Sequence, residues 1–150
     1  PRSVELLTSL RETEPLSPAS FALSVHNAIG RQYSIIRHDV SNVVAVANGL
    51  LTPEAGLIEA LTLAPEALLV VYEASPNPLH APYYPEGASD YAFAWHVKRG
   101  GPLSLHSEAA PGVKDDVGLP HALRVLHFFL SGAASYAVND GQRSYVWRRA

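Results

Sequence analysis

The sequence predicts an α/β fold in which helices cover a mixed, mainly parallel sheet. Residues 43–47 (VVAVA) and 67–72 (ALLVVY) are uninterrupted apolar runs, which are typical of strands buried on both faces of a sheet. A helical pattern with Leu57, Ile58 and Leu61 on its apolar side lies between the two runs. Strand, helix and strand joined by short loops form a βαβ unit, whose two strands are parallel and whose crossover is right-handed.

The composition is that of one globular domain. A chain of 150 residues with 47% hydrophobic residues can bury a sizeable core. The formal net charge of -3 gives no basic surface for nucleic acid. No apolar run approaches the roughly 20 residues of a membrane span. The first residues, PRSVELLTSLRETE, have mixed charges and no signal-peptide core, so we expect a cytoplasmic protein.

Two helical segments are predicted before the first apolar run. Residues 4–10 have apolar side chains at the spacing of a short amphipathic helix. Ser17 and Pro18 suit the N-cap and the first position of a second helix over residues 18–36. Small residues in this second segment would let another backbone approach closely: Ala19, Ser20, Ala22, Ser24, Ala28 and Gly30.

A tight turn connects the first predicted strand to the next helix. Thr52 is a suitable N-cap for that helix, Pro53 suits its first position, and Glu54 favours the positive end of the helix dipole. Enzymes often place a nucleophile at such a turn. Here the turn reads Asn-Gly-Leu-Leu over residues 48–51, and none of these side chains is a good nucleophile.

Further elements follow the second apolar run. Residues 91–97 alternate large and small side chains, as in a half-buried strand. Residues 103–106 are a short strand, and the Asp140-Gly141 pair predicts a hairpin. Loops are predicted at residues 75–87 and 111–118. A helix over residues 120–130 would bury the stripe Leu123, Leu126, Phe129 and Leu130.

Histidines are the most numerous candidates for chemistry. The seven histidines include no pair spaced as in a helical zinc site, and cysteine is absent, so no metal site is predicted. No phosphate-binding or dinucleotide-binding glycine motif occurs, so no cofactor is predicted either. Six of the seven histidines are interpreted as surface or hydrogen-bonded residues. His26 and Asn27, in a small and apolar segment, are expected to be partly buried and therefore hydrogen-bonded.

Three stretches resemble one known family: SPASFALSVHNAIGRQYSI (residues 17–35), NVVAVANGLLTPEAGLIEAL (42–61) and LLVVYEAS (68–75). Together they resemble the amino-terminal half of β-ketoacyl synthases, which have a thiolase fold. The resemblance implies a layered thiolase-like half-fold and a single ketosynthase-like domain over residues 1–150. The family begins with further residues before Pro1, including a first strand. The missing methionine agrees with this, and we expect the chain to lack that N-terminal strand region.

A short subgroup is more similar still. The SxxxFxxSVHNA motif at residues 17–28, the AGLIEAL stretch at 55–61 and the tail at 146–148 resemble ketosynthase-like proteins related to chain length factors of aryl polyene gene clusters. Aligning Asn27 and Ser34 with the family's asparagine and Ser/Thr places its cysteine nucleophile at Leu50. Counting back from Glu59 gives the same position, and Gly49 is the alternative.

This register implies a subunit without its own chemistry. Condensation needs an activated thiolate, which Leu50 cannot supply. The carboxy-terminal half that gives the family two catalytic histidines and a lysine is also missing. The resemblance therefore implies a non-catalytic partner of an active β-ketoacyl synthase, in aryl polyene or polyketide and fatty-acid-like biosynthesis. As a heterodimer it would contact carrier-protein-tethered acyl chains indirectly, with His26, Asn27 and Ser34 as polar interface or pocket residues.

The sequence is also compatible with two other functions. A stand-alone hydrolase or acyltransferase could use Ser24 or Ser34 as nucleophile with His26 as base. A homodimeric binding protein is the other possibility.

Overall fold

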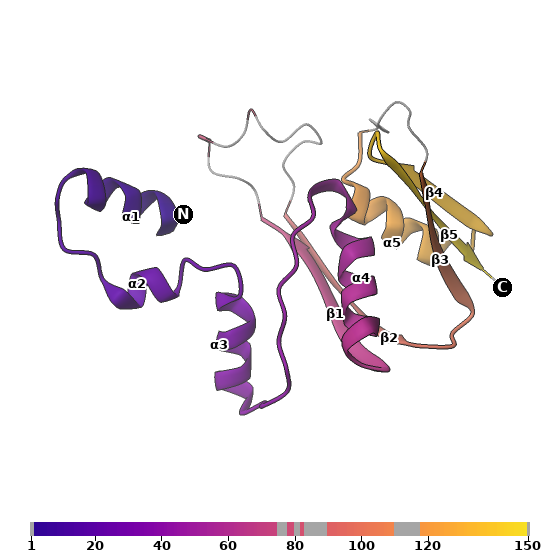
Figure 1. Ribbon diagram of the computed structural model, residues 1–150, viewed down its shortest axis with the longest axis horizontal. Helices are drawn as coiled ribbons and strands as arrows, with labels where there is room; N and C mark the ends of the chain where they lie inside the picture. The colour runs from indigo at the N-terminus through magenta and orange to yellow at the C-terminus, as the bar shows by residue number, and fades with distance from the viewer. Residues whose placement is uncertain (1, 75–77, 80–81, 83–89, 110–117, 150) are drawn as a thin grey trace. The chain divides into compact units, whose positions relative to one another are not determined.

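The computed structural model describes residues 2–74, 78–79, 82, 90–109 and 118–149 (Figure 1). Most of the two loops predicted at residues 75–87 and 111–118 lies outside these ranges. The chain divides into two compact units, residues 1–45 (unit 1) and 46–150 (unit 2), and each is described by itself. Within the described ranges, no helix is both long and apolar enough to cross a membrane.

Unit 1 contains three helices: α1 (Arg2–Arg11), α2 (Pro18–Ala22) and α3 (Ala28–Arg37). The first predicted helix is confirmed, and Ser17 caps α2 by accepting a hydrogen bond from the Ser20 amide at 3.3 Å. The predicted continuous helix over residues 18–36 is wrong, because the chain turns between α2 and α3. At that turn the Ser24 hydroxyl donates to the Phe21 carbonyl at 2.8 Å, which competes with the helical hydrogen-bonding pattern.

The strand predicted at residues 43–47 is not present in the structure, and this is the main correction in this part of the chain. Residues 42–48 are extended but pair with no strand among the described residues, and Val43 and Val44 are exposed. A strand buried on both faces is therefore not observed here. Gly30 of α3 approaches the Val43 side chain so closely that a Cβ at position 30 would collide with it. The small residue thus allows a close approach, although of a side chain and not of another backbone as predicted.

Unit 2 begins with a short 3₁₀ turn, η1 (Gly49–Leu51), which runs directly into α4 (Thr52–Leu63). The next two strands, β1 (Glu66–Glu73) and β2 (Tyr91–Lys98), pair antiparallel along their whole lengths. Figure 1 shows α4 along this two-stranded sheet. The predicted parallel pairing of β1 is not confirmed: within the described residues of unit 2, β1 pairs antiparallel with β2.

One face of the β1–β2 sheet is exposed. The large side chains of β2 lie half-buried on the opposite face, as the alternating pattern predicts. In β1, Val71 is buried, whereas Leu68, Val70 and Tyr72 are exposed. The prediction that β1 is buried on both faces is therefore wrong, because α4 packs against only one of them.

The rest of unit 2 is a three-stranded antiparallel sheet with one helix. The strands are β3 (Leu103–Ala109), β4 (Ser135–Asn139) and β5 (Arg143–Arg149), in the order β3-β5-β4. The predicted hairpin connects β4 to β5, with Gly141 at a φ of 95°. The Arg143 and Gln142 amides donate to the Asp140 carboxylate and hold its pKa below the usual range.

Helix α5 (His121–Ser131) packs on this sheet and ends at Gly132, which has a φ of 71°. Its buried face contains His121, Ala122, Val125 and Phe128, whereas Leu130 is exposed. The predicted apolar stripe is therefore rotated by about one residue. Apolar side chains occur on both candidate faces, so the sequence period did not distinguish them. Val125, Phe128 and Trp147 form the core, with Trp95 and Phe129 packed against it.

Candidate functional site

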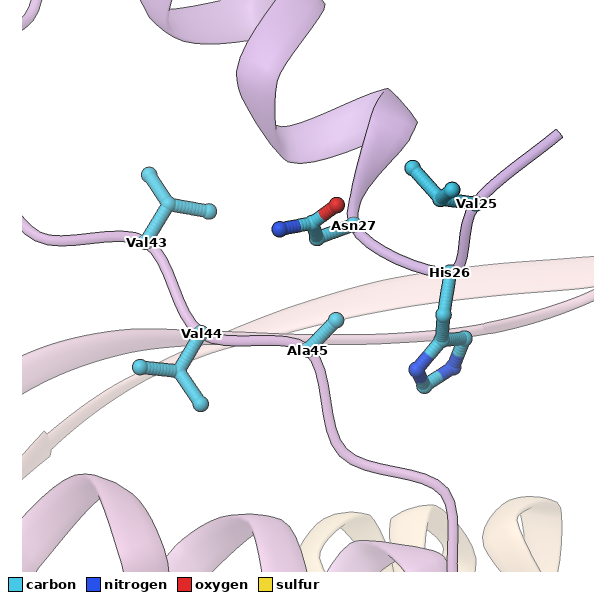
Figure 2. A pocket seen from close by; sticks show the side chains of 6 residues that line it. All are labelled: Val25, His26, Asn27, Val43, Val44 and Ala45. Atoms are coloured by element: carbon cyan, nitrogen blue, oxygen red, sulfur yellow. The ribbon is translucent and has the colours of Figure 1, made fainter. Parts of the chain in front are cut away.

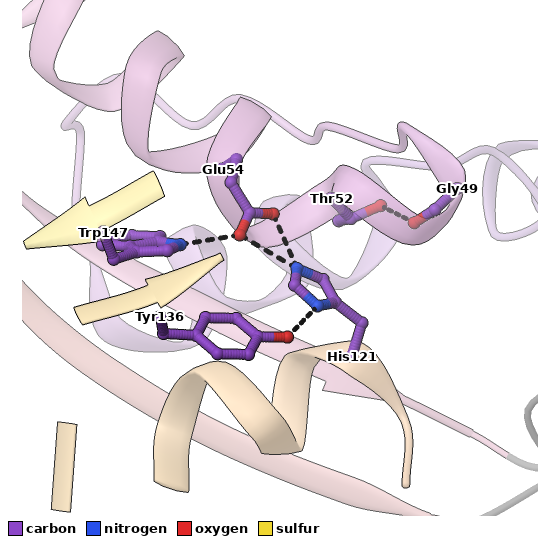
Figure 3. Close-up of polar contacts among 6 residues, drawn as sticks. All are labelled: Gly49, Thr52, Glu54, His121, Tyr136 and Trp147. Atoms are coloured by element: carbon purple, nitrogen blue, oxygen red, sulfur yellow. Dashed lines mark hydrogen bonds and ion pairs between the residues drawn. The ribbon is translucent and has the colours of Figure 1, made fainter. Parts of the chain in front are cut away.

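The turn at residues 48–52, called the empty turn below, is closed by Thr52. Its hydroxyl donates to the Gly49 carbonyl at 2.8 Å (Figure 3). The same hydroxyl accepts from the Asn48 amide at 2.9 Å. Thr52 thus satisfies the backbone before the helix, although it lies at the first position of α4 and not at the N-cap. Gly49 has a φ of 54°, which explains the glycine at this position.

The two candidate nucleophile positions lie in this turn. Leu50 is half-buried and Leu51 is buried, so the turn points one leucine into unit 2 and leaves the other partly open. Gly49 has no side chain, and a Cβ added there would meet no other atom within 4 Å. Neither position carries a group that could attack a thioester.

A buried polar cluster holds the start of α4 in place. Glu54 has no exposed surface and His121 is only 2% exposed. His121 Nε2 lies 2.9 and 3.0 Å from the two Glu54 carboxylate oxygens, and Trp147 Nε1 donates to Oε1 at 2.8 Å. His121 Nδ1 lies 2.9 Å from the Tyr136 hydroxyl. These four residues, called the Glu54 network, converge from α4, α5, β4 and β5 (Figure 3).

The Glu54 network has the connectivity of a proton relay. His121 bonds the Glu54 carboxyl group through Nε2, and a histidine ring has a second nitrogen that can bond another group. This leaves Nδ1 to bond the Tyr136 hydroxyl. Carboxylate, imidazole and hydroxyl in a row resemble a catalytic triad in order. However, Glu54 and His121 are buried too deeply for a substrate to reach them, so the arrangement supports structure at the base of the empty turn.

The residues predicted as polar interface or pocket residues, His26, Asn27 and Ser34, all lie in unit 1. His26, Asn27 and Val25 line an open hollow of about 460 Å³ together with Val43, Val44 and Ala45 (Figure 2). His26 is exposed, so its predicted partial burial is wrong, because it lies on the turn between α2 and α3. Asn27 is half-buried and, with its amide oxygen turned toward Arg31, accepts from Nε of that residue at 3.1 Å.

The two candidate serines are occupied by local hydrogen bonds. Ser34 donates to the Gly30 carbonyl at 3.1 Å, and Ser24 donates to the Phe21 carbonyl. Among the described residues, neither hydroxyl is hydrogen-bonded to His26. A general base must reach its nucleophile, so this geometry gives the hydrolase hypothesis no support.

The sequence did not identify the Glu54 network. The sequence explains Glu54 by the positive end of the helix dipole. It gives no reason to separate His121 from the histidines interpreted as surface or hydrogen-bonded residues. The two residues are 67 positions apart, and no periodic pattern indicates such a contact. The one available signal was His121 at the start of an apolar helix. Within the described ranges, no three histidine, aspartate or glutamate side chains are placed to hold a metal ion.

Fold and site together define a ketosynthase-like α/β protein with a short turn directly before α4. The model of the family "Beta-ketoacyl synthase, N-terminal domain" matches residues 1–148, so the chain belongs to this family. No curated protein matches the sequence. The layered thiolase-like α/β fold predicted from the sequence is confirmed, apart from its parallel pairing.

One solved structure extends this comparison. A chain in the structure of the ketosynthase ApeO in complex with its chain length factor ApeC, from Xenorhabdus doucetiae, superposes with a TM-score of 0.85 at 26% identity. The match covers 99% of this chain and 64% of that one. The chain thus spans somewhat less than two thirds of the length of that relative.

Proposed function

We propose that this chain is a non-catalytic, chain-length-factor-like subunit that pairs with an active β-ketoacyl synthase in aryl polyene or related biosynthesis. The observation that carries the proposal is the empty turn at the start of α4, where the register of the family resemblance assigns the nucleophile position to Leu50, a residue without a thiol. The sequence contains no cysteine to replace it. The similarity to a chain from a complex of a ketosynthase with its chain length factor supports the same role.

Both units belong to one ketosynthase-like domain in this proposal, since a single family model matches residues 1–148. The pairing would take place in the cytoplasm. Acyl chains would reach this subunit while tethered to an acyl carrier protein that serves the partner. Co-expression with a ketosynthase and purification through a tag on one subunit tests the pairing.

The exposed apolar surface of unit 1 is the part of the chain that we assign to the partner synthase. Ala28 is the only buried residue among those described in unit 1. Large apolar side chains on and after α3 are exposed: Ile29, Tyr33, Ile35, Ile36, Val43 and Val44. Exposed large apolar side chains that gather on one surface mark an interaction site, and we propose that these side chains form one. The backbone of residues 42–47 belongs to no helix or strand of the described chain, so we also assign to it hydrogen bonds across the interface.

Leu50 is proposed to limit the length of the acyl chain by closing the end of the partner's tunnel. Leu50→Ala is therefore expected to shift products toward longer chains, because removing three carbons deepens the tunnel. Product masses from the reconstituted complex measure this shift. Leu63→Ala, an exposed leucine at the end of α4, is the matched control and should change nothing. Unaltered product lengths with Leu50→Ala would contradict the role of Leu50.

A further inference from the structure

The Glu54 network connects the empty turn to three other elements of unit 2. Glu54 lies in the first turn of α4, three residues after buried Leu51. Thr52 ties the same turn to the Gly49 carbonyl and the Asn48 amide. The position of Leu50 is thus set by the hydrogen bonds of Thr52 and by the attachment of α4 through Glu54.

The start of α4 is attached to the rest of unit 2 by polar side chains, although apolar side chains could also hold a helix in place. Burying an ion pair costs desolvation energy, and apolar residues of similar volume are often as stabilising. What a hydrogen-bonded pair adds is a defined geometry. Glu54 accepts from Trp147 at 2.8 Å and faces His121 at 2.9 Å, so movement of α4 along or about its axis would break directional bonds.

We infer that Glu54, His121 and Trp147 are positioning residues that hold Leu50 at a fixed depth and thereby sharpen the chain-length limit. This inference rests on the proposed function, since Leu50 must face the acyl chain for its depth to matter. The network touches no acyl chain itself. It acts through the start of α4, and its loss would let the empty turn shift without removing Leu50.

Two variants test the inference in the complex of the full chain with its partner ketosynthase. Glu54→Gln keeps the size of the side chain and one oxygen acceptor. Trp147→Phe removes the donor to Glu54 together with part of the indole, and it keeps an aromatic ring in the core. Both are expected to broaden the distribution of product lengths toward longer chains. The second variant keeps the test decisive if the first does not fold.

Two controls separate positioning from general destabilisation. Val138→Ala creates a cavity at a buried core position outside the network, and it should lower the melting temperature without changing product lengths. His96→Gln alters a second Glu–His pair, with Glu66 at 2.6 Å, that is exposed and far from the turn in sequence. It should change neither quantity.

The product lengths of the double variant with Glu54→Gln and Leu50→Ala give the sharpest test. If the network acts through Leu50, Glu54→Gln should cause no further change in product length once Leu50 is already alanine. Additive shifts in the double variant would overturn the inference, as would unchanged lengths in both single variants. Copurification with the synthase is measured in parallel. If the wild-type chain does not copurify with the synthase, the proposed function is rejected. If the complex forms but both single variants give wild-type product lengths, only this inference is rejected.

Discussion

His121→Ala is expected to lower the free energy of unfolding of unit 2 by about 3–5 kcal/mol, because it leaves the Glu54 carboxylate buried without its main partner. Trp147 would still donate to Oε1 of Glu54, but the buried carboxyl group would lose the contacts of both its oxygens with His121. Denaturant unfolding of the full chain measures the change. The two tryptophans, Trp95 and Trp147, both lie in unit 2, so their fluorescence reports on this unit.

His96→Ala is the matched control for this prediction. His96 also faces a glutamate, at 2.6 Å, but both side chains are more than half exposed. Exposed pairs of this type contribute about 0–1 kcal/mol, so the control should unfold at nearly the wild-type denaturant concentration. Equal losses in the two variants would contradict the central structural role given to the buried pair.

Val44→Asp is expected to weaken association with the partner ketosynthase by about 100-fold or more, which corresponds to about 2.7 kcal/mol. Val44 is 49% exposed and lines the hollow of unit 1, so the free chain can accommodate a carboxylate there. In the complex the same carboxylate would be desolvated against an apolar surface without a partner. Titration of labelled partner into each variant measures the change in affinity.

The control for this variant is Val40→Asp. Val40 is fully exposed and precedes the extended segment, so the same charge there should change the affinity little. Wild-type affinity for Val44→Asp would show that this part of unit 1 lies outside the interface.

Local patterns predicted most of the elements. The alternation of β2, the Asp-Gly hairpin and the Gly132 stop of α5 all depend on a few neighbouring residues, and each was found. The turn with Gly49 was also predicted, because glycine adopts a positive φ at little cost. The residues that determine each of these features lie within the feature itself or next to it in the sequence.

The burial of side chains and the pairing of strands were predicted less well, because both depend on residues that are distant in the sequence or belong to another subunit. Apolar residues 43–47 read as a buried strand, yet no strand within the described chain pairs with them. An interface with another subunit produces the same apolar pattern as a core. The contact of His121 with Glu54 was missed for a related reason, since a pair 67 residues apart leaves no periodic signal.

The most direct test of the central claim is the mass of the particle that forms when the chain is co-expressed with a candidate ketosynthase. We expect a stable complex containing equal numbers of the two subunits, seen by light scattering after gel filtration. The complex should also show condensing activity that depends on the synthase's cysteine alone. A chain that elutes apart from every ketosynthase tested would contradict the proposed function.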